Sequence, residues 1–362
     1  MKSYFRTYWP LLLVAVIMSA EALALASFAG VEPKDILPFA GVALAVTVAF
    51  PVNPELTAIA IAFQNPAVQL IADQVLPRIP VPKKFVYTAY TVAQGYTVPD
   101  TKIGRKSEPN MVDFGGALIN SECLDWGLDD LVPNDEIAAW EAMPKPATGG
   151  PVNPLALSTM MLTGLVQLDR EIRVAGVVFN AANYSGANQS TLSGTSQWSD
   201  QVNSNPLNAI AAALDIPLVR PNTLALGQQV WTQLRQNKFI VQAIGRSAQV
   251  GGYASREQVA GLLELNQILV GSAFFNTAKK GQAPAYSRAW GKHAALLHVD
   301  ALGAQMQQPT FGWTGQFGTR IAGEIPEPKK GLRGGTTVRS GESVIEVIAS
   351  ADAGYFFQNA VA

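Results

Sequence analysis

The sequence has few charged residues and a single cysteine. Asp, Glu, Lys and Arg make up 15% of its 362 residues, against roughly a quarter in an average soluble domain, while hydrophobic residues reach 48%. A soluble monomer with so few charges would cover its surface poorly, so we expect either a membrane or extensive subunit contact. The formal net charge of -1 argues against a protein whose main task is to grip nucleic-acid phosphates. The lone Cys123 excludes an intrachain disulfide.

The sequence also lacks a catalytic or metal-binding constellation. His293 and His298 are five residues apart in a strand-like segment, so they point to opposite faces and make a poor metal pair. Residues 245–249 begin like a nucleophile elbow but lack its final glycine, and no phosphate-binding glycine motif occurs. The acidic doublets at 129–130 and 135–136 lack the spacing of a calcium loop. We therefore expect no enzyme activity, no cofactor and no metal.

The most regular pattern runs from Asn153 to Tyr184 and predicts one long helix. Asn153 is a good N-cap, and Pro154 suits the first helical position, where its missing N–H costs nothing. Apolar residues then recur at alternating spacings of four and three on one narrow stripe: Met161, Leu165, Leu168, Ile172, Ala175 and Phe179. Such a helix is on the order of 45 Å long and suits a spine that carries sheets and loops. A long core helix of another α+β protein fits the same pattern.

A long polar loop lies between two predicted strands. Residues 85–92 are rich in β-formers, and residues 111–118 are their predicted return partner. The intervening residues 94–110 are too many for an ordinary connection in a compact domain, so we expect this loop to have a function or to lie against a neighbour. Three basic residues near its tip are candidates for subunit contact: Lys102, Arg105 and Lys106.

The acidic stretch 122–141 supplies further candidates. It contains seven acidic residues and neither Lys nor Arg, which predicts a solvated face or a surface that meets a basic patch on another subunit. Asp129 and Asp130 are the contact candidates within it. Three charged residues of the long helix lie off its apolar stripe, on faces that can meet water or another chain, and are added to them: Asp169, Arg170 and Arg173.

The flanking segments predict a mixed α and β organisation. Before the loop we expect short helices at 54–62 and 66–75 and a proline-rich extended arm at 76–82. After the long helix, an α/β-like lobe is predicted from about 206 to 299, with helices at 206–214 and 228–237, a helix capped by Ser255, and strands at 224–226 and 266–270. Strands dominate from there, with a hairpin turn predicted at Ser340-Gly341.

The first 48 residues are apolar and differ from the rest. Lys2 and Arg6 precede an apolar run at 9–20, which is typical of a signal peptide or of a first membrane helix. An upstream extension from a start codon assigned too early fits the same residues.

Nine segments together resemble the major capsid proteins of tailed bacteriophages and prophages. They occur in order over roughly Phe50 to Ala362: NPELTAIAIAFQNP, IADQVLPRIPV, GYTVPDTKIGRKSEPN, GLDDLVPN, QLDREIRVAGVVFN, TLSGTSQW, WGKHAALL, FGTRIAGEIPEPKKGLRGG and GYFFQNAVA. The resemblance implies the α+β Hong Kong-type capsid fold. In that fold an N-terminal arm, an extended β-hairpin loop, a peripheral domain with a long spine helix and an axial domain build the hexamers and pentamers of an icosahedral shell.

The resemblance also implies a division of this chain. Residues 1–48 depart from the pattern, as a mis-assigned start or an extra arm. The remaining ranges are 49–83 for the arm, 84–120 for the extended loop, 121–205 for the peripheral domain with the spine helix at 153–184, 206–300 for the axial domain, and 301–362 for strands returning to the peripheral domain.

By the same resemblance we expect a structural protein of the virion, assembled in the host cytoplasm, that encloses DNA without reading its sequence. A scaffold, a portal and a maturation protease would be its partners, and no stable membrane association is expected. Lys102 or Lys106 could serve a covalent crosslink. Two alternatives remain open: an encapsulin-like compartment with an enzyme cargo, and a membrane-anchored bacterial surface protein that uses residues 9–30 as its anchor.

Overall fold

The computed structural model describes residues 50–63, 70–89, 96, 98–111, 117–144, 152–245, 252–300 and 309–362. The chain divides into two units, Met1–Val52 and Asn53–Ala362. The signal-like or membrane-like segment expected in residues 1–48 lies outside the described residues. Within the part that is described, no helix is both long and apolar enough to cross a bilayer.

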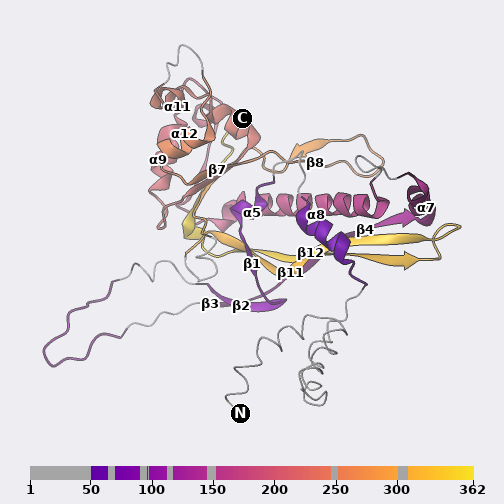
Figure 1. Ribbon diagram of the computed structural model, residues 1–362. Coiled ribbons are helices and arrows are strands. Elements are labelled where there is room, and N and C mark those ends of the chain that lie inside the picture. The colour runs from indigo at the N-terminus through magenta and orange to yellow at the C-terminus, as the bar shows by residue number, and fades with distance from the viewer. Residues whose placement is uncertain are drawn as a thin grey trace. The chain divides into compact units, whose positions relative to one another are not determined.

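Four strands of the second unit form one sheet, in the order β1-β11-β12-β4 (Figure 1). Their bounds are Arg78–Pro80 for β1, Gly312–Glu327 for β11, Gly335–Ile348 for β12 and Leu124–Pro133 for β4. β1 runs parallel to β11, and the other pairs are antiparallel. Buried and partly exposed residues alternate along much of β12, which is the pattern of a sheet with one face covered.

β11 and β12 form one long hairpin, but its turn is not the predicted one. The prediction at Ser340-Gly341 is wrong, because both residues lie inside β12. Close strand pairing requires a glycine there, since a Cβ on Gly341 would lie 2.6 Å from the Trp126 carbonyl oxygen of β4. The chain reverses instead at Gly331 and Gly334, whose positive φ angles of 65° and 74° suit glycine.

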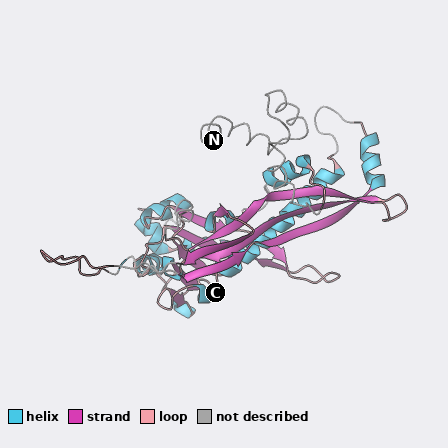
Figure 2. Cartoon of the chain, turned by 90° about the horizontal axis from the view of Figure 1, so that it is seen from below, coloured by secondary structure: helices cyan, strands magenta, loops and turns pink. Residues whose placement is uncertain are grey.

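The predicted long helix is α8, Pro154–Val178, with 25 residues. Asn153 caps it as predicted, since its side-chain oxygen accepts a hydrogen bond from the Leu155 N–H at 3.0 Å. The helix ends earlier than expected, with Phe179 as its C-cap and a separate 3-10 turn at Ala181–Asn183. Seen from below, the long strands lie in front of this helix (Figure 2).

The buried face of α8 is not the predicted apolar stripe. Of the six stripe residues only Ala175 is buried, while Met161 and Leu165 are 65% and 54% exposed. The buried face is mixed in polarity: Ser158, Thr159, Leu162, Thr163, Val166, Gln167, Arg170, Glu171, Val174, Ala175 and Val178. Its polar members can be buried because they are hydrogen-bonded, as Thr163 is with Ser340 of β12 at 3.0 Å.

A small core joins helix α4, Pro54–Ala62, to α8 and the four-stranded sheet. α4 has the predicted bounds, and its cap Asn53 accepts a hydrogen bond from the Glu55 N–H at 2.9 Å. The core consists of Leu56, Ala60, Val132, Leu162, Ala322 and Val338. Of the helix predicted at 66–75, the described residues contain only α5, Ala72–Val75.

A five-stranded sheet lies at the centre of a second, larger core. Its strand order is β5-β13-β10-β6-β7. Its strands are Gln189–Thr191 (β5), Gly354–Gln358 (β13), Ala294–Leu297 (β10), Thr223–Gly227 (β6) and Gln267–Gly271 (β7), and its helices are Pro206–Leu214 (α9), Gln228–Leu234 (α10), Lys238–Ala243 (α11) and Arg256–Leu262 (α12). The predictions for α9, β6, β7 and the Ser255-capped α12 are confirmed. The helix predicted at 228–237 ends earlier, at Leu234, and a separate helix starts at Lys238, where the Asn237 side chain caps it by accepting from the Phe239 N–H at 3.1 Å.

Two segments belong to this sheet although the sequence placed them elsewhere. β13 falls in the range 301–362, all of which was expected to return to the peripheral domain, yet it pairs with β10 and β5. β5 itself falls in the range 121–205 that was expected to be peripheral. The physical cause is burial: Phe356 and Phe357 point to opposite faces of the sheet, and both are buried.

Two short ribbons complete the unit. β2 (Lys84–Ala89) pairs with β3 (Ala117–Glu122), and β8 (Phe274–Asn276) pairs with β9 (Tyr286–Arg288). Of the return strand predicted at 111–118, residues 112–116 lie outside the described residues, and 117–118 belong to β3. The β2–β3 ribbon contacts the four-stranded sheet through aromatic rings, since the Phe85 and Tyr87 centroids lie 5.7 and 5.8 Å from that of Trp313.

Candidate functional site

The loop tip, residues 98–111, is exposed along its whole length. Asp100 stabilises the loop tip through two hydrogen bonds. Its carboxylate accepts one from the Lys102 N–H at 2.9 Å, and its backbone carbonyl accepts one from the Asn110 side chain at 2.7 Å. The three predicted contact residues of the tip form no ion pair with any described residue: Lys102, Arg105 and Lys106. Their charges are therefore available to another chain.

The same loop tip exposes apolar side chains. Val98 is 82% exposed, Ile103 is 57% exposed, and Met111 is almost completely exposed. Such side chains gain free energy when a partner covers them, at roughly 25 cal/mol for each Å² removed from water. The loop tip thus combines a basic end with an apolar body, which is a composition suited to protein contact.

The acidic surface consists of β4 and helix α7, Asn134–Ala142. Asp129 already has a partner, because Arg339 donates two hydrogen bonds to its carboxylate at 2.7 and 2.6 Å and thereby lowers its pKa. Asp130 accepts a hydrogen bond from the Ser158 hydroxyl at 2.7 Å. α7 contains no buried residue, and its Glu136 and the following Glu141 are exposed without a described partner.

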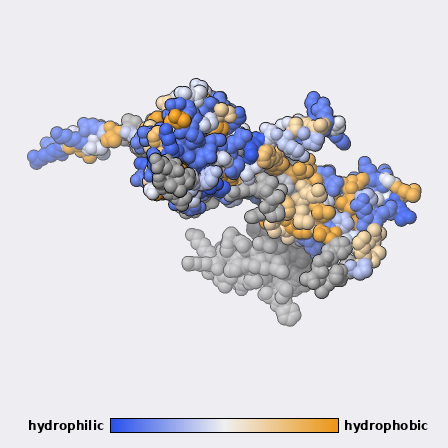
Figure 3. Space-filling view, turned by 90° about the horizontal axis from the view of Figure 1, so that it is seen from above, coloured by the Kyte–Doolittle hydropathy of each residue, from blue (hydrophilic) through white to orange (hydrophobic). Residues whose placement is uncertain are grey.

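The outer side of α8 is an apolar face made by Leu157, Met161 and Leu165. All three are exposed, and the view from above shows that apolar atoms gather on part of the surface (Figure 3). Met161 and Leu165 belong to the apolar stripe predicted from the sequence, and Leu157 lies one turn before Met161 on the same side. An uncovered apolar helix face in a chain with few charges points to an interface.

The three charged candidates of α8 lie in different environments. Asp169 is half-exposed and pairs with Arg173 one turn later at 3.0 Å. Arg173 also pairs with Glu346, and its guanidinium lies 3.9 Å from the centroid of the Trp126 ring. The prediction that Arg170 lies on a face open to water is wrong, because Arg170 is only 2% exposed.

Arg170 belongs to a buried ionic network that the sequence did not reveal. It pairs with Asp73 of α5 and donates a hydrogen bond to the Thr314 hydroxyl at 2.9 Å. Glu342, whose side chain is completely buried, accepts from Arg78 at 2.8 Å and from Arg320 at 2.9 Å. Burial alone would raise the pKa of Glu342, but the two arginines together lower it.

Glu171, the neighbour of Arg170, fixes the chain at Ile71 and Ala72 to α8. Its carboxylate accepts hydrogen bonds from the Ile71 and Ala72 N–H groups, both at 2.9 Å, and from the Trp290 indole. Burial raises its pKa despite these three donors.

The described residues hold no group of three or more potential metal ligands. His293 accepts a hydrogen bond from the Asn359 N–H at 3.0 Å and packs against Phe356, and His298 contacts the Arg220 carbonyl at 2.9 Å. Both histidines therefore have structural contacts.

No family model matches the sequence. The major capsid protein of Pseudomonas phage JBD67 is 46% identical over 316 residues, which are 86% of this chain and 98% of that protein. Among solved structures, a phage-related protein from Bordetella bronchiseptica RB50 has a TM-score of 0.64 at 19% identity, over 85% of this chain and 97% of its own. The capsid structure of the Cyanophage P-SCSP1u has a TM-score of 0.52 at 10% identity, over 82% and 89%. These relatives give no support to an encapsulin-like compartment or a membrane-anchored surface protein.

Proposed function

This chain belongs to the phage major capsid proteins, and we propose that its copies contact one another through the loop tip, the acidic surface and the apolar face of α8. As a major capsid protein it self-assembles into the hexamers and pentamers of an icosahedral head that encloses the genome. The observation that carries the proposed contacts is exposure: charged and apolar side chains of the loop tip have no cover within the described chain.

The loop tip fits the acidic surface of a neighbouring copy. Its three basic residues complement the carboxylates of α7, of which Glu136 and Glu141 have no described partner. Asp129 and Asp130 act by adding to the negative potential, since their hydrogen bonds are already made within the chain. In this proposal residues 84–120 form a loop that reaches over the neighbour, and residues 49–83 form an arm.

The function is structural rather than enzymatic, and we expect the shell to form in the host cytoplasm. A scaffold, a portal and a maturation protease are the proposed partners of assembly. The chain would enclose DNA without sequence-specific contacts, which agrees with its formal net charge of -1.

Negative-stain electron microscopy with a sedimentation profile tests this proposal, on the full chain and on a version that starts at Phe50. Closed shells or hexameric rings from both versions support it, and rings from the shorter version alone would restrict it to residues 50–362. A monodisperse monomer from the shorter version, beside a full chain found only in membranes, would contradict it.

A further inference from the structure

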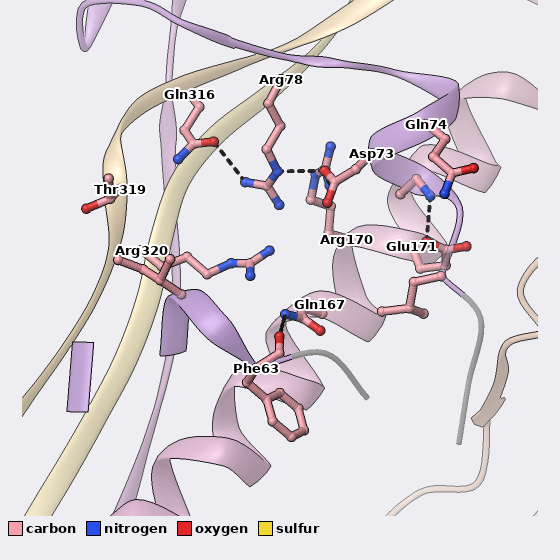
Figure 4. A pocket seen from close by; sticks show the side chains of 13 residues that line it. Phe63, Asp73, Gln74, Arg78, Gln167, Arg170, Glu171, Gln316, Thr319 and Arg320 are labelled. Atoms are coloured by element: carbon pink, nitrogen blue, oxygen red, sulfur yellow. Dashed lines mark hydrogen bonds and ion pairs between the residues drawn. The ribbon is translucent and has the colours of Figure 1, made fainter. Parts of the chain in front are cut away.

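A cavity of about 550 Å³ lies where the arm crosses α8 and β11. Residues from the end of α4, from α5 and β1, from α8 and from β11 line it (Figure 4). Three of the lining residues are arginines, Arg78, Arg170 and Arg320, each from a different segment. Few cavities in a folded subunit collect three cations, because buried charges of like sign repel one another.

The three guanidinium groups are not equally satisfied. Arg78 contacts Asp73, Glu342 and Gln316. Arg320 is bonded to Glu342 through Nε at 2.9 Å, and its two Nη groups have no partner among the described residues. Arg170 is almost fully buried, and its Nε is likewise without a hydrogen bond in the part of the chain that the structure describes. The cavity therefore offers donors that lack acceptors.

The acidic groups nearby leave part of the guanidinium hydrogen-bonding capacity unused. Asp73 lies between Arg78 and Arg170, and Glu342 lies between Arg78 and Arg320, so two carboxylates serve three arginines. Glu171 also lines the cavity, but its oxygens accept from two backbone N–H groups and the Trp290 indole. Burial and the charge of Arg78 lower the pKa of Arg170, which means that its charged form is under-compensated as it stands.

We propose that this cavity binds one oxyanion, a carboxylate or a phosphate, on the two Nη groups of Arg320. The planar fork of a guanidinium matches the paired oxygens of such a group. Figure 4 shows the Arg320 side chain extending from β11 toward the space between Arg78 and Gln167. The bound anion supplies the acceptor that the described residues do not give to these Nη groups.

The oxyanion can come from two sources: a free anion in solution, or a carboxylate side chain of a second copy of the chain. Either one stabilises the folded subunit, because a ligand that binds only the folded state shifts unfolding by mass action. The anion would then add to the Glu171 hydrogen bonds and the β1–β11 pairing, which hold this segment against α8 and β11.

The test is the binding of inorganic phosphate to unassembled full-length subunits at pH 7, by calorimetry and by thermal unfolding, against sodium chloride of equal ionic strength. We expect a saturable rise in the unfolding midpoint with phosphate. Arg320→Met should weaken phosphate binding at least tenfold, and Arg320→Lys, which keeps the charge for Glu342 but loses the fork, should weaken it less. Arg339→Met is the matched control, since Arg339 is a paired arginine on the neighbouring strand β12, away from the cavity lining, and should leave phosphate binding unchanged.

No saturable binding by the unaltered subunit, or an equal response in Arg320→Lys and the unaltered chain, overturns the proposal. If Arg320→Met does not fold, the unaltered subunit and Arg320→Lys decide alone. Assembled shells distinguish the sources: shells that still bind phosphate indicate a free anion, and shells that do not, beside subunits that do, indicate a carboxylate of a second copy.

Discussion

The buried carboxylate of Glu171 accepts a hydrogen bond from the indole nitrogen of Trp290, and so links α8 to the chain that enters β10 of the five-stranded sheet. The same carboxylate accepts from the Ile71 and Ala72 N–H groups. One side chain therefore connects α8 with the start of α5 and with the chain that leads into the five-stranded sheet. Because every partner is a donor, a carboxylate is required at this point rather than an amide.

Trp290→Phe should reduce the free energy of unfolding of the dissociated subunit by about 1–3 kcal/mol, since a buried carboxylate loses a donor. Trp198→Phe is the control: Trp198 is equally buried, but its indole nitrogen has no partner within the described residues. Urea unfolding of both variants measures the difference. Equal losses would mean that the hydrogen bond of Trp290 contributes nothing beyond its packing.

Gly271→Ala should destabilise the subunit by on the order of 3 kcal/mol, because its Cβ would overlap the Trp290 ring in a core that cannot expand. Gly176→Ala in α8 should instead be neutral or stabilising by up to about 1 kcal/mol, since a Cβ there meets no atom within 4 Å. Thermal unfolding of the two variants checks this. A tolerated Gly271→Ala would show that β7 and Trp290 can separate easily.

Glu342→Gln should cost about 3–5 kcal/mol at pH 7, because it leaves Arg78 and Arg320 without their shared buried carboxylate. The pKa of Glu342 is lowered in the folded state, so its contribution is complete above the pKa of an unfolded glutamate, about 4.3, and is lost as the pH falls through the folded value. Urea unfolding between pH 7 and 3 should therefore show a shallower loss of stability in the variant. If the free energy of unfolding depended on pH in the same way in Glu342→Gln and in the unaltered subunit, this role of Glu342 would be contradicted.

Arg105→Glu should reduce shell formation strongly while leaving the fold of the subunit intact, because the reversed charge would face the acidic surface of a neighbour. Arg105→Lys keeps the charge and should assemble. Sedimentation of assembly reactions, with circular dichroism of the subunits, measures both effects. Normal shells from Arg105→Glu would remove the loop tip from the proposed contact.

Asp169→Ala should also impair assembly more than folding, since Asp169 is half-exposed and its pair with Arg173 is worth only about 0.3–0.5 kcal/mol within a helix. The same sedimentation assay measures shells, and urea unfolding measures the subunit. A loss of subunit stability that accounts for the loss of shells would assign Asp169 an intrachain role only.

Met161→Asp should block assembly with a change in subunit stability within about 0.5 kcal/mol, as for other exposed positions. Its side chain belongs to the apolar face of α8. Val202→Asp, at another exposed apolar residue, is the control and should assemble. If both variants form shells equally well, the apolar face of α8 lies on a free surface.

The elements that the sequence predicted correctly are those determined by residues close to one another in the chain. The bounds of α9 follow from Pro206 and the apolar residues after it, and Asn153 caps α8 by a contact two residues away. β4 was missed because Asp129-Asp130 and Gly127 disfavour a strand. That segment is extended only because β12 pairs with it along its whole length, which is a contact between distant parts of the chain.

The arginine cluster could not be predicted for the same reason. Arg78, Arg170 and Glu342 are far apart in the sequence, and nothing local to any of them indicates its partners. One local signal does exist. Arg170 lies on the same face of the helix as the polar Thr163 and Gln167, and the same helical spacing is therefore compatible with a buried face that is partly polar. The predicted apolar stripe has the more regular spacing, but in the fold its Met161 and Leu165 are exposed and only Ala175 is buried.

The order of strands also has a consequence for synthesis. In the two larger sheets a strand from late in the chain lies between strands made earlier: β12 lies between β11 and β4, and β13 lies between β10 and β5. Until residues 335–358 have left the ribosome, β4 and β5 have no partner in their sheets, and neither core can close. The nascent chain therefore cannot complete either sheet, and so cannot reach the native fold of the subunit, until β12 and β13 have been translated.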